Sequence, residues 1–302
     1  MFDEPANDSC AAATVRHTVR LSGVGLHSGR DAGLLIEPAP AGWGVRFIRT
    51  DIDGPLAARM IPADPRLVTQ TQLGTVLTNE AGASIATVEH LLAAFAMLGI
   101  TDARVQCSGP EIPILDGSAR EFIEAIEAAG VWTLPHAVDR LAPLRSVRVE
   151  QGESWATAEP LPRNAVAQFV LDVTIDFEHP SIGLQRIVIE GDRETLRREV
   201  AAARTFTELR LVEKLREMGL ARGGSLDNAI VVGANGIINP EGLRMEREFV
   251  RHKVLDLVGD LYLLGMPLGC KVTAYKPGHT LNTALALELC GVEAAAPMMM
   301  PA

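Results

Sequence analysis

The stretch Phe249-Val-Arg-His-Lys-Val-Leu-Asp-Leu-Val-Gly-Asp260 places His252, Asp256 and Asp260 at successive four-residue steps in an otherwise apolar pattern. Residues four apart lie on one face of an α-helix, about a turn apart, so His252 and Asp256 can converge on one point. The apolar neighbours predict a helix that is buried on much of its circumference, where polar groups are costly unless they are paired. An imidazole and a carboxylate presented together are half of a metal site with nitrogen and oxygen ligands.

The pair also has a simpler interpretation, an ordinary pair on a helix surface. In a chain of this composition, chance alone would supply about 0.35 His-x-x-x-Asp pairs at this helical step. The position of the pair inside an apolar helix, together with another His elsewhere in the chain, is what favours a metal site.

The bulk composition is that of a globular protein. The chain has 302 residues, enough for one large or two ordinary domains, and 47% of them are hydrophobic, enough to bury a core. The net charge of −10 argues against nonspecific nucleic-acid binding, so no nucleic-acid partner is expected. A local Lys/Arg pocket for a phosphorylated small molecule is still compatible with this charge.

Cysteine usage and the chain ends predict a soluble cytoplasmic protein. The scattered cysteines include no Cys-x-x-Cys pair, which fits reduced thiols. Residues 1–14 lack the basic and apolar regions of a signal peptide and are expected to be a frayed extension. The apolar runs are too short for a membrane span.

Two helices are predicted at comparable places in the two halves of the chain. Thr87 is expected to cap a helix over 88–98 that stops at Gly99, and a long helix is expected over about 244–264. Each is followed by a strand, a Gly-containing loop and another helix. We infer a structural repeat in which a helix of each half supplies one ligand His, with the site between two domains.

The other segments follow from their apolar patterns and breakers. The sequence predicts strands at 14–21, 32–38, 44–49, 73–78, 103–107, 145–150, 167–177, 185–190, 229–232 and 270–275, helices at 119–129, 193–202, 208–217 and from about 279, and a linker over 131–140 that contains Pro135.

Glu89 and His90 supply the other half of the candidate site. Both fall in the first turn of the predicted helix, where an acid is favoured by the helix dipole, and a capping Glu beside a packed His is the structural alternative. Two His and one carboxylate (His90, His252, Asp256) would leave an open coordination position, as in catalytic zinc sites. Glu89, beside a ligand, could then take a proton from water.

His279 and Thr205 are weaker candidates. His279 follows the turn Tyr275-Lys-Pro-Gly278, where a histidine is more often a loop or cap residue, but Asp260 could hold it charged as a general acid requires. Thr205 could donate a hydrogen bond to an oxyanion, although composition alone does not favour that role.

Several motifs that contain these residues resemble the UDP-3-O-acyl-N-acetylglucosamine deacetylases, the zinc enzymes of the committed step in lipid A synthesis. The resemblance runs in order from about Arg16 to Leu289. The motifs are Gly23-Val-Gly-Leu-His-Ser-Gly29, Ser84-Ile-Ala-Thr-Val-Glu-His-Leu91, Pro110-Glu-Ile-Pro-Ile-Leu-Asp-Gly-Ser118, Ala203-Arg-Thr-Phe206, Phe249-Val-Arg-His-Lys253 and Thr273-Ala-Tyr-Lys-Pro-Gly-His279.

The resemblance implies an α+β fold with two domains of related topology, each a sheet with packed helices, and an active site between them. The domains would span 15–134 and 140–294, with an inserted β-α-β unit around 205–235. The implied reaction removes the N-acetyl group from UDP-3-O-(3-hydroxyacyl)-N-acetylglucosamine and gives the free amine and acetate. The partner would be this small-molecule substrate, and we expect a monomer.

The resemblance also implies a role for each site residue. His90, His252 and Asp256 would bind Zn²⁺, Glu89 would be the general base and His279 the general acid, with Asp260 orienting His279 and Thr205 helping to bind the oxyanion. The implied substrate contacts are Lys253 and Lys276 with the phosphate or sugar region, Phe177 with uracil, and Phe206. Ser154 stands where some relatives carry a lysine, so whether this chain makes the nucleotide contact of that lysine stays an open question.

Three questions stay open in the sequence. A zinc amidohydrolase could act on another N-acyl sugar. A structural metal site is the non-enzymatic alternative, but such sites use four protein ligands and only three are convincing here. Four apolar residues at helical spacing would line an acyl passage in the family and could equally pack against the domain: Leu211, Val212, Leu215 and Met218.

Overall fold

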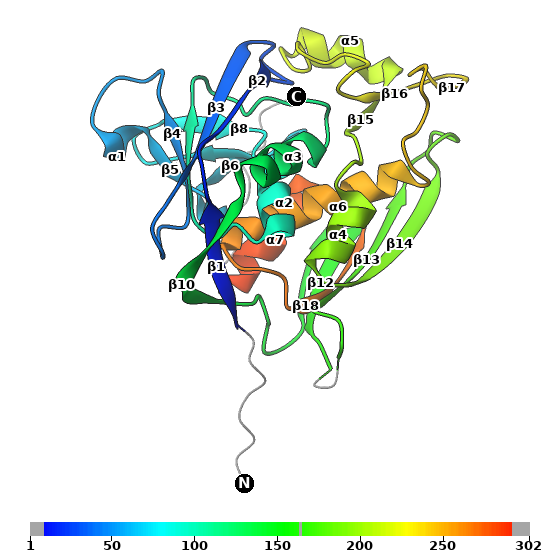
Figure 1. The fold of residues 1–302 in the computed structure, drawn as a ribbon. Helices are drawn as coiled ribbons and strands as arrows, with labels where there is room; N and C mark the ends of the chain where they lie inside the picture. The colour runs from blue at the N-terminus through cyan, green and yellow to red at the C-terminus, as the bar shows by residue number, and fades with distance from the viewer. Residues whose placement is uncertain (1–8, 163–164, 292–302) are drawn as a thin grey trace.

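Two five-stranded sheets of the same topology form the framework of the protein (Figure 1). The computed structural model describes residues 9–162 and 165–291. One sheet has the strand order β2-β3-β9-β4-β5 and the other β11-β12-β18-β13-β14. In both, the central strand pairs antiparallel with the second strand and parallel with the fourth. The sheets match strand for strand, which confirms the predicted α+β fold with two units of related topology.

The strands of the first sheet are β2 (Val19–Val24), β3 (Asp31–Pro38), β4 (Val45–Arg49), β5 (Met60–Pro62) and β9 (Ala103–Cys107). Those of the second are β11 (Val147–Gln151), β12 (Ser154–Pro160), β13 (Phe169–Asp176), β14 (Leu184–Gly191) and β18 (Cys270–Tyr275).

Helices α2 (Glu89–Leu98) and α6 (Glu248–Leu261) lie between the two sheets and pack against each other (Figure 1). Both are buried over most of their residues, because neighbouring elements cover them on several sides. Gly259 permits the contact: a Cβ there would lie 2.0 Å from the Glu89 carbonyl oxygen. The neighbouring helices are α3 (Arg120–Ala129), α4 (Arg193–Val200) and α7 (His279–Leu289).

Two three-stranded sheets extend from the framework. The first joins β6 (Val68–Gln70), β7 (Val76–Thr78) and β8 (Ser84–Ala86), and the second joins β15 (Phe206–Glu208), β16 (Ile230–Gly233) and β17 (Gly236–Ile237). Because β15 pairs parallel with β16 and α5 (Leu209–Glu217) connects them, they form a β-α-β unit. Helix α5 has no buried residue, so its apolar side chains do not reach the core.

The N-terminal extension and the linker differ from the sequence prediction. Residues Ser9–Val15 form β1, which pairs antiparallel with β10 (Val131–Asp139), so the predicted fraying through residue 14 is wrong for 9–14 and the predicted linker is a strand. Burial of Ala12 and Val15 explains the ordering of β1. The ladder shifts register between Ala11 and Ala13, and Pro135 lies at this shift on the other strand. A proline, which has no N–H to donate, is tolerated at such an irregularity. Residues 1–8 and 292–294 lie outside the described ranges.

Smaller differences concern helix ends. Thr87 does not cap α2, because its backbone is left-handed and its hydroxyl donates to Glu111 Oε1 at 3.1 Å, whereas Gly99 ends the helix in the left-handed region as predicted. The long helix begins at Glu248 and gives way to a 3-10 turn, η2 (Tyr262–Leu264). The predicted strand 14–21 is divided between β1 and β2. Two short helices complete the described elements, α1 (Leu56–Arg59) and η1 (Pro65–Leu67).

Within residues 9–162 and 165–291, none of the helices has the length and apolar character that a membrane crossing requires.

Candidate active site

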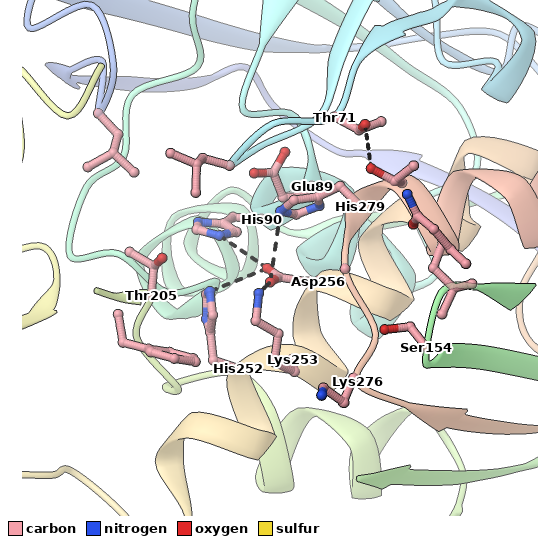
Figure 2. Close-up of a pocket in the computed structure, with 17 residues that line it drawn as sticks. Thr71, Glu89, His90, Ser154, Thr205, His252, Lys253, Asp256, Lys276 and His279 are labelled. Atoms are coloured by element: carbon pink, nitrogen blue, oxygen red, sulfur yellow. Dashed lines mark hydrogen bonds and ion pairs between the residues drawn. The ribbon is translucent and has the colours of Figure 1, made fainter. Parts of the chain in front are cut away.

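A cavity of about 290 Å³ lies where the starts of α2 and α7 meet the middle of α6 (Figure 2). Both halves of the chain line it. The predicted site residues on its wall are Glu89, His90, Thr205, Phe206, His252, Lys253, Asp256, Lys276 and His279.

Three of these residues form a candidate metal centre. His90 of α2 and His252 and Asp256 of α6 each present a ligand atom, and these atoms lie within 4.8 Å of one another. The Asp256 Oδ1 atom is 3.3 Å from His252 Nε2 and 3.6 Å from His90 Nε2. Ligands of a tetrahedral zinc ion are separated by about 3.3 Å, so the cluster has the dimensions of a zinc site.

The protonation of His252 supports the same interpretation. His252 Nδ1 lies 3.0 Å from the Ala203 carbonyl oxygen, and because a carbonyl only accepts, Nδ1 must donate. Burial lowers the pKa of His252 to about 3, against the opposing effect of Asp256, so the imidazole is neutral and Nε2 carries a lone pair. Asp256 is ionised: charge interactions outweigh burial and hold its pKa well below the usual range, and the Lys253 ammonium lies 2.9 Å from its Oδ2. Two acceptors thus face each other at Nε2 and Oδ1, an arrangement that a cation between them would stabilise.

An unpaired atom at the cluster agrees with this. Within the described ranges, Asp256 Oδ1, the atom that faces both histidines, is buried and has no hydrogen-bond partner. An unpaired buried carboxylate oxygen is costly, whereas a metal ligand needs no hydrogen. The residues therefore fit a divalent cation with two nitrogen ligands and one oxygen ligand.

Glu89 adjoins the metal cluster in sequence and lines the same cavity. Its side chain is almost fully buried, and burial raises its pKa, although His279 and His90 act in the opposite direction. Its Oε2 atom accepts a hydrogen bond from the backbone N–H of Thr75 at 3.1 Å. A carboxylate with a raised pKa is suited to accept a proton near neutral pH.

His279, which lines the cavity, forms a buried pair with Asp260. His279 Nδ1 donates to Asp260 Oδ2 at 2.9 Å, and its Nε2 lies 4.0 Å from Asp256 Oδ2. Burial lowers the pKa of His279, but the carboxylates of Asp260, Asp256 and Glu89 outweigh burial and raise it to about 9. An imidazolium at neutral pH can donate a proton.

Thr205 is held by its backbone on both sides. Its N–H donates to the Gly117 carbonyl at 2.8 Å and its carbonyl accepts from Ile230 N–H at 2.8 Å. The preceding residue, Arg204, is buried and donates through Nε to Glu248 Oε1 at 2.9 Å, which ties this segment to the start of α6. The Thr205 side chain lines the cavity (Figure 2).

The two lysines lie on the wall in different settings. Lys253 Nζ donates to Asp256 Oδ2 at 2.9 Å, so it contacts the proposed metal ligand directly. Lys276 Nζ is 3.1 Å from the exposed Glu153. Ser154 also lines the cavity near Lys276 (Figure 2), and its short side chain carries no charge.

The two phenylalanines differ in access to the cavity. Phe206 lines it, with the Lys253 ammonium 5.7 Å from the ring centroid. Phe177 does not line the cavity and packs edge-on against Phe206, with ring centroids 5.5 Å apart. The implied uracil contact of Phe177 stays a prediction.

The structure adds wall residues that sequence reasoning did not single out, Leu26, Thr71 and Leu73, and the buried Thr75 behind them. Leu26 lies within one of the quoted motifs. The segment from Thr71 to Thr75 has no polar periodicity or metal-ligand spacing that would have indicated a site.

Known proteins resemble the chain over almost its whole length. The family model described as UDP-3-O-acyl N-acetylglycosamine deacetylase matches residues 12–291. The chain is 47% identical over 270 residues to a UDP-3-O-acyl-N-acetylglucosamine deacetylase of Myxococcus xanthus, which covers 89% of the chain and 83% of the relative. Proteins of the same name from Photobacterium profundum and Anaeromyxobacter dehalogenans are 44% and 45% identical, covering 90% and 93% of the chain and 88% of each relative. The chain belongs to the UDP-3-O-acyl N-acetylglycosamine deacetylase family.

Proposed function

We propose that this protein is a zinc-dependent deacetylase that hydrolyses the acetamide of UDP-3-O-(3-hydroxyacyl)-N-acetylglucosamine, the committed step of lipid A synthesis. The names of the relatives support the substrate. The observation that carries the chemistry is that His252 Nε2 faces Asp256 Oδ1 at 3.3 Å in a cavity that Glu89 and His279 also line.

His90, His252 and Asp256 would hold the zinc ion, with one coordination position left for the reactants. Zinc bound there would lower the pKa of a water molecule and polarise the acetamide carbonyl.

Two residues of the cavity wall divide the proton transfers between them. Glu89 accepts a proton from the attacking water as the new C–O bond forms, and the Thr205 hydroxyl donates a hydrogen bond to the developing oxyanion. When the C–N bond breaks, His279 gives its proton to the departing amine, leaving acetate and the free glucosamine nitrogen. Asp260 orients His279 and keeps it charged.

The cavity wall also supports the substrate class. Lys253 and Lys276 provide positive charge for the sugar and phosphate region, and Phe206 offers an aromatic surface beside them. Leu211 in α5 is 42% exposed and Met218, directly after α5, is 49% exposed, and an acyl chain would cover these side chains. Photo-crosslinking from an acyl tail tests this passage, and labels that land only outside α5 would refute it.

The decisive experiment measures acetate release from the acylated UDP-sugar by the purified protein, with a chelator and with zinc add-back. We expect the chelator to abolish activity and zinc to restore it. Activity that survives complete metal removal would refute the zinc mechanism. Equal turnover of free N-acetylated sugars would favour an amidohydrolase of other specificity, and metal binding with no hydrolysis of either substrate would favour a structural metal site.

A further inference from the structure

The loop between β6 and β7 connects the two proton-transfer groups. Thr75 is fully buried at the end of this loop, and its backbone N–H donates to Glu89 Oε2 at 3.1 Å. Its hydroxyl donates to Asp260 Oδ1 at 2.6 Å and lies 3.4 Å from His279 Nδ1. One residue therefore contacts the proposed base, the proposed acid and the carboxylate that orients the acid.

The hydrogen bonds of Asp260 show what the hydroxyl contributes. Asp260 Oδ2 accepts from His279 Nδ1 at 2.9 Å and from Asn282 Nδ2 at 2.8 Å, whereas Oδ1 accepts only from Thr75 among the described residues. Without the Thr75 hydroxyl, one oxygen of a fully buried carboxylate would lose its partner. The carboxylate could then rotate, and the His279 ring would lose its fixed orientation.

The surrounding loop is itself anchored to both halves of the protein. Thr71 Oγ1 lies 2.7 Å from Thr280 Oγ1, next to His279 at the start of α7. His27 Nε2 lies 3.0 Å from the Leu73 carbonyl oxygen, and Leu73 has a left-handed backbone. A side chain at Gly74 would approach Glu89 Oε1 at 3.2 Å, so the loop fits closely around the carboxylate.

We propose that Thr75 is a positioning residue that aligns Glu89 with the Asp260–His279 pair, so that one residue fixes the relative orientation of the base and the acid. The residue acts on the orientation of the two groups and does not touch the substrate. This inference rests on the proposed deacetylase function. It requires a loss in kcat with little change in KM, because substrate contacts stay intact.

The test compares Thr75→Val, which removes the hydroxyl at nearly constant volume and keeps the backbone donor, with Thr75→Ser, which keeps the hydroxyl. The control is Thr78→Val, since Thr78 pairs with Thr69 in the same small sheet at 2.7 Å. We expect Thr75→Val to lower kcat on the order of 10-fold to 100-fold with KM within about twofold. Thr75→Ser and Thr78→Val should stay within about threefold of the unmodified protein.

Unchanged kcat in Thr75→Val would overturn the proposal, as would an equal loss in Thr75→Ser, which would assign the effect to side-chain volume. If Thr75→Val does not fold, Thr75→Ala replaces it in the comparison, because it also removes the hydroxyl and leaves space for a water molecule. A ¹⁵N-histidine spectrum of the folded variants provides a second measurement: the His279 Nδ1 resonance should move in Thr75→Val or Thr75→Ala and stay in place in Thr75→Ser. Inactivity of the unmodified protein would instead refute the proposed function, so the two failures are distinguishable.

Discussion

Gly259→Ala tests the contact between α2 and α6 that brings the two halves of the site together. The added Cβ would lie 2.0 Å from the Glu89 carbonyl oxygen, 2.8 Å from its carbonyl carbon and 3.0 Å from its Cα. All three atoms are backbone, so no flexible side chain can relieve the overlap. Restoring ordinary contact requires the helices to separate by about 1.4 Å.

The expected effect is larger on activity than on stability. Overpacking costs about 1–3 kcal/mol, but replacing a helical glycine with alanine returns about 1 kcal/mol through helix propensity, so we expect a net loss of about 0–2 kcal/mol. A shift on the order of 1 Å separates Glu89 and His90 from His252 and Asp256, and misplacement of that size costs on the order of 10²-fold in rate.

The assay measures kcat/KM for acetate release, zinc content and thermal unfolding. Gly109→Ala is the matched control, because a Cβ there meets its nearest neighbour, the Asp31 carbonyl oxygen, at an ordinary 3.7 Å. A Gly259→Ala protein with normal activity and a raised melting temperature would refute the reasoning, because it would show that the two helices do not need this close approach.

The remaining predictions concern the base, the acid and α5. Glu89→Gln should retain bound zinc but lose about 10²–10⁴-fold in turnover, whereas Glu124→Gln, at an exposed position, should keep normal turnover. Near-normal turnover of Glu89→Gln would remove Glu89 from its role. Because the pKa of His279 is raised to about 9, the acid is protonated below that pH, and activity should fall as pH rises through about 9. Asp260→Asn removes a charge that raises this pKa, so the falling limb of the pH–rate profile should move to lower pH, and an unmoved limb would assign it to another group. Leu211→Glu and Met218→Glu should leave the melting temperature within about 2 °C, since both side chains are exposed, and should raise KM for long acyl chains more than for short ones. Equal effects on both chain lengths would place the acyl group elsewhere.

Local patterns were sufficient for much of the fold. The four-residue spacing of His252, Asp256 and Asp260 predicted a helix with these side chains on one face, and α6 has that arrangement. The glycine stop at Gly99 and the start of α7 at His279 also follow from local chemistry. These predictions succeeded because helix periodicity and capping depend on residues within a few positions of one another.

Predictions that depended on distant partners were less successful. Residues 9–14 and 131–139 have little local signal for a strand, yet each completes the hydrogen-bond ladder of the other. Thr87 is of a residue type that commonly caps helices, but its hydroxyl donates to Glu111, more than twenty residues away in the sequence. The resemblance to the deacetylases implied a substrate contact for Lys253, and only the folded chain shows that Lys253 pairs with Asp256.

The sequence by itself determined which residues could perform the chemistry, because the residue types and their helical spacing are local properties. It also indicated, through the repeated helix–strand–loop–helix pattern, that each half would supply a ligand. Only the tertiary structure decided that Glu89 and His90 meet His252 and Asp256, through an approach of two helices that Gly259 permits. It alone placed Thr75 between Glu89 and Asp260, because a loop residue acquires its partners from packing between segments far apart in the chain.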